Sequence, residues 1–244
     1  GHYSNGSGCG NDAAAERSMV SKYIVDSVLY WADEYHIDGF RFDLVGLIDI
    51  DTINELVATV RAKHPNVIFY GEGWSMATEM TKPDVAMATQ HNAYMTPNFA
   101  YFSDTLRDVL RGYVFDDHAY GYVAGAQGQE ELVKACFMGH PDWCPNPTQT
   151  INYASCHDNM SLFDRLTLST PDAGFAERVR MNNLAAAIYM LSQGVPFLQA
   201  GEELLRSKPL PGGGFEHNSY CSPDSVNSIK WNDLGKPVYA ANAD

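Results

Sequence analysis

Apolar residues recur at helical spacing at the start of the chain and alternate there with short extended segments. Residues 13–35 predict a helix, because side chains of one face recur at Val20, Tyr23, Ile24, Val28 and Trp31. "IDGFRF" then predicts a strand. A second helix is expected to begin at the capping-box sequence "TINE" (52–55), with Thr52 as the cap, and to end at "KHP".

The alternation continues along the chain. "VIFY" (67–70) is rich in β-branched and aromatic residues and predicts the next strand. Helix–strand alternation of this kind is typical of a parallel sheet with crossover helices, which makes the fold class α/β. Later strands are expected at 99–102, 150–158 and 195–200, and later helices at "SDTLRDVLRG", ending at Gly112, and at 176–194.

Three carboxylates stand where predicted strands end. Asp43 follows "GFRF", Glu72 follows "VIFYG", and Asp158 follows "NYASCH". In a (β/α)₈ barrel the carboxyl ends of the strands converge on the face that holds the active site, so these acids are expected to meet. A single acid of this kind often only caps a helix or closes a loop. Three of them, with Arg41 and His157 beside them, favour an active site.

Paired carboxylates suit glycoside chemistry, in which one attacks the anomeric carbon and the other protonates the departing oxygen. Arg41 lies two residues before Asp43, so it shares a strand face with Asp43 and would keep it ionised as a nucleophile. Glu72 must begin protonated, and Trp74 would make its surroundings more apolar. A retaining enzyme would hold the two carboxyl groups about 5–5.5 Å apart.

The composition limits the classes of molecule that the protein is expected to bind. The 244 residues are 45% hydrophobic, which allows a sizeable core, and carry a formal net charge of −14, which argues against a nucleic-acid or anionic-membrane surface. No apolar run approaches the roughly 18 residues of a membrane span. The N-terminal segment lacks the layout of a signal peptide, and the sequence does not decide the protein's location.

The five cysteines do not form a disulfide framework, because they are odd in number and scattered. Cys136, His140 and Cys144 are spaced like ligands on a helix. However, "GHPDW" would break a helix there, and the paired C-x-x-C of structural zinc is missing. Ordinary thiols are therefore favoured over a zinc site, and no metal-ligating residues are predicted.

These residues resemble a known family. "DGFRFDLVG", "YGEGW" and "NYASCHDN" are similar to three signature segments of the α-amylase superfamily of glycoside hydrolases. The segments that narrow the resemblance to type I pullulanases are "NGSGCGND", "GEGW", "HDNMSLFDRL", "FLQAGEELLRSK" and "HNSYCSPDSVN". Isoamylase-like chains tend to place Gly after the final "HD", where this chain has Asn159.

The resemblance implies roles for single residues. It makes Asp43 the nucleophile, Glu72 the acid/base and Asp158 the stabiliser of the transition state. It also implies that residues from these segments and from loops near the glucan cleft bind substrate: Arg41, Trp74, His157, Asn11, Arg206, Asn218 and Asp224. For the loop residues, stabilisation of their own loops is an equally supported reading. The chemistry needs no cofactor, and the sequence leaves open whether structural calcium is bound.

The resemblance further implies part of a (β/α)₈ TIM barrel, strands four to eight with their crossover helices. Residues 1–244 would form the C-terminal portion of the catalytic barrel domain, with no second domain. The family's signature segment on the third strand is not found in the chain. We therefore expect a fragment that is inactive and poorly folded when expressed alone.

The expected activity is retaining hydrolysis of α-1,6-glucosidic linkages in pullulan, amylopectin or limit dextrins, with an α-glucan as the partner. Two alternatives stay open. The first is an α-amylase or glycogen-debranching relative, which would keep the chemistry and change the bond. The second is a non-catalytic glucan-binding barrel, although such relatives usually lose one or more of the acids.

Overall fold

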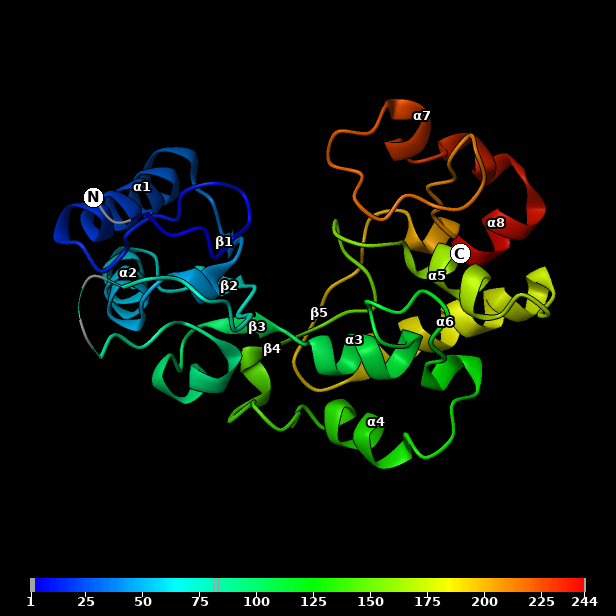
Figure 1. The fold of residues 1–244 in the computed structure, drawn as a ribbon, viewed down its shortest axis with the longest axis horizontal. Helices are drawn as coiled ribbons and strands as arrows, with labels where there is room; N and C mark the ends of the chain where they lie inside the picture. The colour runs from blue at the N-terminus through cyan, green and yellow to red at the C-terminus, as the bar shows by residue number, and fades with distance from the viewer. Residues whose placement is uncertain (1–2, 81, 83, 244) are drawn as a thin grey trace. The chain divides into compact units, whose positions relative to one another are not determined.

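The computed structural model describes residues 3–80, 82 and 84–243 (Figure 1). The chain forms two compact units. Unit 1 comprises Gly1–Phe102 and Asp142–Ile151, and unit 2 comprises Ser103–Pro141 and Asn152–Asp244. The expectation of one folding domain stays a prediction.

Unit 1 follows the predicted helix–strand alternation. Its elements are α1 (Ser18–Tyr35), β1 (Gly39–Phe42), η1 (Val45–Leu47), α2 (Ile50–Lys63), β2 (Ile68–Gly71), η2 (Gln90–Met95), β3 (Ala100–Phe102) and η4 (Pro147–Gln149). β1 pairs with β2 in parallel, with Arg41 opposite Tyr70 and Phe42 opposite Gly71, and β2 pairs with β3 in parallel. The parallel sheet expected from the sequence is therefore confirmed.

Apolar faces of α1 and α2 form the core of unit 1 with the strands. The helices contribute Val25, Val28, Ile53, Leu56, Val57 and Val60, and the strands contribute Phe69 and Tyr101. These helix residues recur every three or four positions, as a helix that buries one face requires. The core fixes the strands, and the strands in turn fix the loops at their carboxyl ends.

The start of α2 differs from the prediction. Asp49 is the cap, because its Oδ1 accepts a hydrogen bond of 2.9 Å from the Thr52 backbone N–H, and the helix begins at Ile50. The capping box with Thr52 as the cap is therefore wrong. An earlier start buries Ile50 within the first turn, since its side chain is 3% exposed. The predicted end is confirmed, with Lys63 the last helical residue.

Unit 2 is mainly helical. Its elements are α3 (Asp104–Arg111), η3 (Tyr122–Ala124), α4 (Glu130–Phe137), α5 (Leu162–Ser169), α6 (Phe175–Leu191), β5 (Val195–Pro196), η5 (Glu202–Leu204), α7 (Asp224–Asn227), η6 (Trp231–Gly235) and α8 (Pro237–Ala243). α3 ends as predicted, with Gly112 at a φ of 94°. α4 ends before His140, so the sequence "GHPDW" interrupts the helix as expected.

The last two strands are shorter than predicted. β4 (Thr150–Asn152) pairs in parallel with β3 and ends at Asn152, so the expectation that it reaches residue 158 is wrong. Tyr153 and Ala154 remain buried beyond its end, which shows that the apolar run marks burial and not strand pairing. β5 is also short, and the Phe197 N–H donates to the Asn152 carbonyl at 2.8 Å. The strand order is β1-β2-β3-β4-β5.

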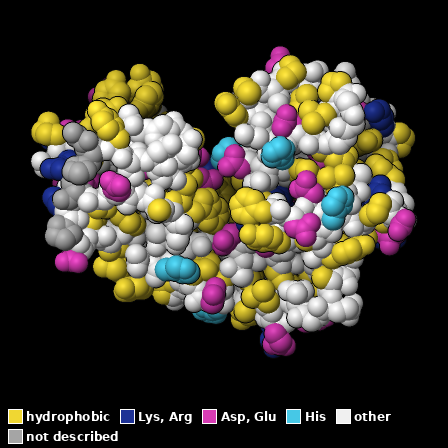
Figure 2. All heavy atoms as spheres, viewed as in Figure 1, with side chains coloured by type: hydrophobic (Ala, Val, Ile, Leu, Met, Phe, Trp, Pro, Cys, Tyr) yellow, Lys and Arg dark blue, Asp and Glu magenta, His cyan; other side chains and the backbone are white. Residues whose placement is uncertain are grey.

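The surface agrees with the composition. On the face drawn in Figure 2, acidic side chains are widespread and Lys and Arg are sparse, in line with the net charge of −14. Within the described part of the chain, we find no helix with the length and apolar character that crossing a bilayer requires.

Candidate active site

In unit 1, one arginine contacts two of the predicted acids. Arg41 lies in β1, and its Nη1 pairs with Asp43 Oδ1 while its Nη2 lies 2.7 Å from Glu72 Oε1. The guanidinium also lies 5.7 Å from the centre of the Phe102 ring, a cation–π distance. The parallel pairing of β1 and β2 places both acids one residue beyond their strands. The expected Arg41–Asp43 contact is therefore confirmed.

Glu72 is buried, with 3% of its surface exposed. Its Oε2 accepts a hydrogen bond of 3.1 Å from the Leu44 N–H, and its backbone carbonyl accepts one of 3.1 Å from the Gly46 N–H. The turn after β1 thus holds both the side chain and the backbone of Glu72. Leu44 has a φ of 46°, in the left-handed region that non-glycine residues seldom adopt.

The two glycines of "YGEGW" are explained by close approaches on either side of Glu72. A Cβ at Gly71 would lie 2.5 Å from the Phe42 carbonyl oxygen, and one at Gly73 would lie 2.5 Å from the Tyr101 ring. Such distances are far inside van der Waals contact. Glycine at both positions therefore lets the neighbouring strands approach the segment that holds the acid.

Asp43 differs from Glu72 in its exposure. The Asp43 side chain is 62% exposed, yet one of its carboxylate oxygens lies within 4.8 Å of an oxygen of Glu72. One acid is thus open to solvent and the other is enclosed. This is the kind of difference in environment that separates the roles of two neighbouring carboxylates.

The other two site residues predicted in unit 1 are less constrained. Trp74 follows Glu72 by two residues and is half-buried, and its backbone packs closely against Gly46. Asn11 is exposed, in the coil before α1. Its neighbour Asp12 accepts hydrogen bonds from the Gly6 and Ser7 N–H groups and from the Thr78 hydroxyl. Although burial raises the pKa of Asp12, these hydrogen bonds outweigh it and hold the pKa at about 2.

In unit 2, His157 and Asp158 lie in the segment between β4 and α5. Asp158 is six residues beyond the end of β4, so it does not directly follow the strand as predicted. His157 Nε2 lies 3.5 Å from Asp158 Oδ1, and both side chains are more than half exposed. Asn159 follows with a φ of 63°, a left-handed conformation that Asn adopts more readily than most residues.

A cavity of about 500 Å³ within unit 2 collects several predicted site residues. His157, Asp158 and Arg206 line it together with Phe197 and Tyr220. Arg206 donates hydrogen bonds to the carbonyls of Ala200 and Asn227, at 3.0 and 2.8 Å.

Two other predicted loop residues are placed differently. Asn218 and Asp224 are exposed and are not among the described residues that line the cavity. The Asn218 backbone N–H donates to Glu216 Oε1 at 3.0 Å, and Asp224 is the first residue of α7. The structure therefore brings Arg206 to the cavity with His157 and Asp158, and leaves Asn218 and Asp224 exposed outside the described lining.

The structure also shows cavity residues that the sequence did not reveal. Lys208 is 2% exposed, lines the cavity, and donates from Nζ to Ser219 Oγ at 2.7 Å. Burial lowers the pKa of its ammonium group. Its backbone N–H donates to the buried carboxylate of Asp164 at 2.7 Å. No periodic pattern marks Lys208 in the Pro- and Gly-rich segment that contains it, so only the fold could place it.

Comparison with known proteins identifies the family. Residues 10–232 match the Alpha-amylase family, described as alpha amylase, catalytic domain. The chain belongs to this family. It is 39% identical to a Pullulanase of Bacillus subtilis, over 93% of the chain and 32% of that protein. It is 30% identical to Pullulanase 1, chloroplastic, of Arabidopsis thaliana, over 91% of the chain and 28% of that protein.

Solved structures agree with this assignment. A Pullulanase from an Anoxybacillus species, complexed with maltotriose, superposes with a TM-score of 0.92 at 42% identity, over 100% of the chain and 34% of that protein. A Pullulanase from Paenibacillus barengoltzii, complexed with maltohexaose and alpha-cyclodextrin, has a TM-score of 0.91 at 40% identity, over 99% of the chain and 37% of that protein.

The chain thus spans about a third of the length of these relatives. Its fold is that of part of a (β/α)₈ barrel, strands four to eight with their crossover helices, as predicted. The resemblance to pullulanases that the sequence motifs indicated is confirmed.

Proposed function

We propose that the chain belongs to a retaining glycoside hydrolase that cleaves α-1,6-glucosidic linkages in pullulan, amylopectin or limit dextrins. The observation that supports this most directly is Arg41, which contacts both Asp43 and Glu72 at the ends of adjacent parallel strands. Carboxylate oxygens within 4.8 Å suit the short separation of retaining enzymes, in which a carboxylate and not a water attacks the sugar. The pullulanase relatives favour the α-1,6 bond.

In the proposed mechanism, Asp43 attacks the anomeric carbon and forms a glycosyl ester as the bond to the leaving oxygen breaks. Glu72 gives its proton to that oxygen. In the second step Glu72 takes a proton from water, which attacks the same carbon and releases Asp43. The exposed Asp43 carboxylate suits a group that must reach the sugar, and the ion pair with the Arg41 guanidinium orients it.

The surroundings of Glu72 have two opposing effects on its charge. Burial favours the neutral acid, whereas the Arg41 guanidinium and the Leu44 N–H favour the carboxylate. The proton-donating role therefore depends on the balance between them. As Asp43 forms the ester it loses its negative charge, so the Arg41 guanidinium is left to stabilise the Glu72 carboxylate that forms when Glu72 gives up its proton.

We assign the remaining residues by family resemblance. Asp158 stabilises the transition state, and His157, which lies against it, binds the sugar. Trp74 lines the leaving-group side and Arg206 borders the glucan, while Asn11, Asn218 and Asp224 contact the glucan from loops near the cleft. The chemistry requires no cofactor, since two carboxylates supply both the nucleophile and the proton.

Product analysis tests this proposal. The full-length gene product is incubated with pullulan and, separately, with linear amylose. Maltotriose from pullulan with little amylose breakdown is the expected result. Panose or isopanose from pullulan, or rapid amylose hydrolysis, would indicate an α-amylase. Binding of dye-labelled glucan without any hydrolysis would indicate a non-catalytic module.

A further inference from the structure

Unit 2 contains a second, smaller cavity whose lining includes two buried arginines. Its volume is about 220 Å³, and Arg111 and Arg165 line it together with Asn159, Met160 and His217. Arg111 comes from the last turn of α3 and Arg165 from α5. Both are 2% exposed. Two guanidinium groups so far from water require compensation for their positive charge.

The hydrogen bonds of Arg111 do not supply that compensation. Its Nη1 donates to the Met160 carbonyl at 2.9 Å, and its Nε, which is buried, has no partner among the described residues. A neutral carbonyl accepts one hydrogen bond from Arg111 but does not neutralise the positive charge of its guanidinium group. Burial, and then the neighbouring Arg107, lower the pKa of Arg111 to about 10, so the group still carries its charge at neutral pH.

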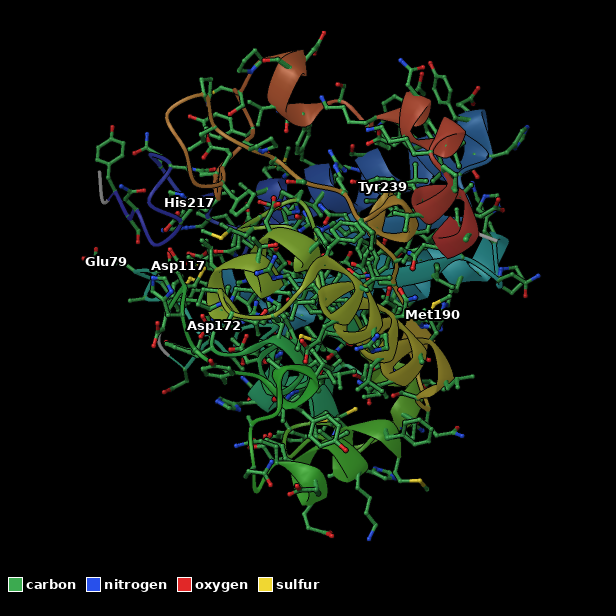
Figure 3. All side chains as sticks on the ribbon, turned by 90° about the vertical axis from the view of Figure 1, so that its right-hand side faces the viewer. Glu79, Asp117, Asp172, Met190, His217 and Tyr239 are labelled. Atoms are coloured by element: carbon green, nitrogen blue, oxygen red, sulfur yellow. The ribbon has the colours of Figure 1, made fainter. Side chains whose placement is uncertain are left out.

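Arg165 is also held mainly by neutral groups. Its Nη2 donates to the carbonyls of Tyr113 and Ala119, at 3.0 and 3.3 Å. Among the described residues, it forms an ion pair with Asp117, whose side chain is 56% exposed, at 3.6 Å between Nη1 and Oδ1. Asp117 is the one carboxylate in the described lining, against two arginines and His217. Figure 3 labels Asp117 and His217.

The buried acid Glu202, whose pKa Arg111 influences, does not neutralise the arginines. Glu202 accepts hydrogen bonds of 2.6 Å from Ser155 and Tyr189. Burial raises the pKa of Glu202, which favours its neutral form, and Arg111 only partly opposes this. The charges of Asp108 and Asp116 also act on these arginines, but neither residue is among the described residues that line the cavity. The lining itself therefore combines two buried guanidinium groups, an unpartnered N–H and enough volume for an ion.

We propose that this cavity binds a small inorganic anion of the size of chloride, held by Arg111 and Arg165. The Nε of Arg111 would donate to the ion, and the Asn159 side chain could add a neutral donor from the opposite segment. The ion would lie behind the turn that follows Asp158, since Met160 both lines the cavity and binds Arg111. This inference does not depend on the proposed hydrolase function.

The test compares anions at constant ionic strength in the full-length gene product. The melting temperature is measured in chloride and in the bulky anion gluconate, and crystals are soaked in bromide for anomalous diffraction. We expect chloride to raise the melting temperature by about 2–4 °C, because an ion bound only by the folded state stabilises it. We also expect a bromide peak in the cavity beside Arg111.

Arg111→Met should remove the chloride dependence, since it deletes the charge and keeps most of the volume. Arg178→Met is the matched control and should keep it. Arg178 also binds only backbone carbonyls, those of Thr170 and Pro171, and does not line the cavity. If Arg111→Met fails to fold, the bromide map of the unaltered protein still decides. No bromide peak in the cavity, or a chloride dependence that persists in Arg111→Met, would overturn the proposal.

Discussion

The Nη2 atom of Arg41 lies 2.7 Å from Oε1 of the buried Glu72, while the Nη1 atom of the same side chain pairs with Asp43. One planar guanidinium thus fixes two carboxylates that follow adjacent strands. Lysine has a single ammonium group and cannot present two such donors in a fixed fork. Arg41 therefore couples the positions of both proposed catalytic acids.

Arg41→Lys should lower kcat/KM on pullulan by roughly 10–100-fold, the loss expected from one charge-assisted hydrogen bond of about 1.5–3 kcal/mol. Steady-state kinetics of the full-length gene product provides the measurement. Arg61→Lys serves as a control, because Arg61 binds Val67 and Asn98 in the same unit and contacts neither acid. Equal activity of Arg41→Lys and the unaltered enzyme would contradict the bridging role.

Asp43→Asn should reduce turnover by roughly 10³-fold or more while the protein keeps its melting temperature. The amide is a poor nucleophile and cannot form the glycosyl ester. Asp51→Asn, at an exposed position on α2, is the matched control and should be fully active. Pullulan hydrolysis by Asp43→Asn at a tenth of the normal rate would rule out Asp43 as the nucleophile.

Trp74→Ala should impair pullulan cleavage more than hydrolysis of a small activated glycoside. Only the polymer has a leaving chain that would use the Trp74 side, so contacts of about 1–3 kcal/mol, or roughly 10–200-fold, are lost for the polymer alone. The ratio of kcat/KM for the two substrates is the readout. A uniform loss on both would mean that Trp74 acts through the fold of the Glu72 segment.

Glu202→Gln should weaken the pH dependence of stability. Burial raises the pKa of Glu202 above its ordinary value of 4.5, so the stabilising neutral form is fully present below pH 4.5. That contribution is lost as the pH rises through the pKa of the folded state. Glutamine stays neutral and can bond to both Ser155 and Tyr189, the two partners of Glu202.

Melting temperatures between pH 4.5 and pH 8 check this prediction for Glu202. The unaltered protein should lose stability over that range by more than Glu202→Gln does, at about 1.4 kcal/mol for each unit of pKa difference. Glu177→Gln, at an exposed position in the first turn of α6, should leave the slope unchanged. Parallel curves for Glu202→Gln and the unaltered protein would show that Glu202 is not the group responsible.

Gly73→Ala should destabilise the protein by about 1–3 kcal/mol, because the new methyl group would lie 2.5 Å from the Tyr101 ring. Denaturant unfolding measures the change. Gly212→Ala is the control, since a Cβ at Gly212 has no neighbour within 4 Å among the described residues. A melting curve of Gly73→Ala that matches the Gly212→Ala curve would contradict the close packing around Glu72.

Local sequence patterns predict where the helices lie better than they predict the first residue of each helix. The pattern locates the short helix α3 correctly, because Ser103 marks where it begins and Gly112 marks where it ends. The capping-box pattern places the start of α2 too late, because Asp49 caps the helix and Ile50 is buried in its first turn. The predicted ends of the strands were also wrong, because burial and strand pairing are different properties. Apolar runs report burial, and Tyr153 is buried without belonging to β4.

Asp43 and Glu72 could be predicted from the sequence, because a carboxylate directly after a short apolar strand is unusual. The strands β1 and β2 do place both acids beside Arg41. Residues brought together by loops could not be read in this way. Lys208 reaches its cavity through the path of an irregular segment, and the buried pair Arg111 and Arg165 comes from two helices whose packing no single helical pattern specifies.

The shortness of β5 has a dynamic consequence for the larger cavity. Its two residues are exposed, and the amide of Phe197 joins it to Asn152 of β4, whereas four residues of β1 are in register with β2. Segments with few buried contacts open at low free energy, so the amides of 195–200 should exchange with deuterium well before those of β1 and β2. Phe197, Leu198 and Gln199 form one wall of the cavity that contains His157 and Asp158. That wall can therefore open without global unfolding, and its opening would widen the cavity.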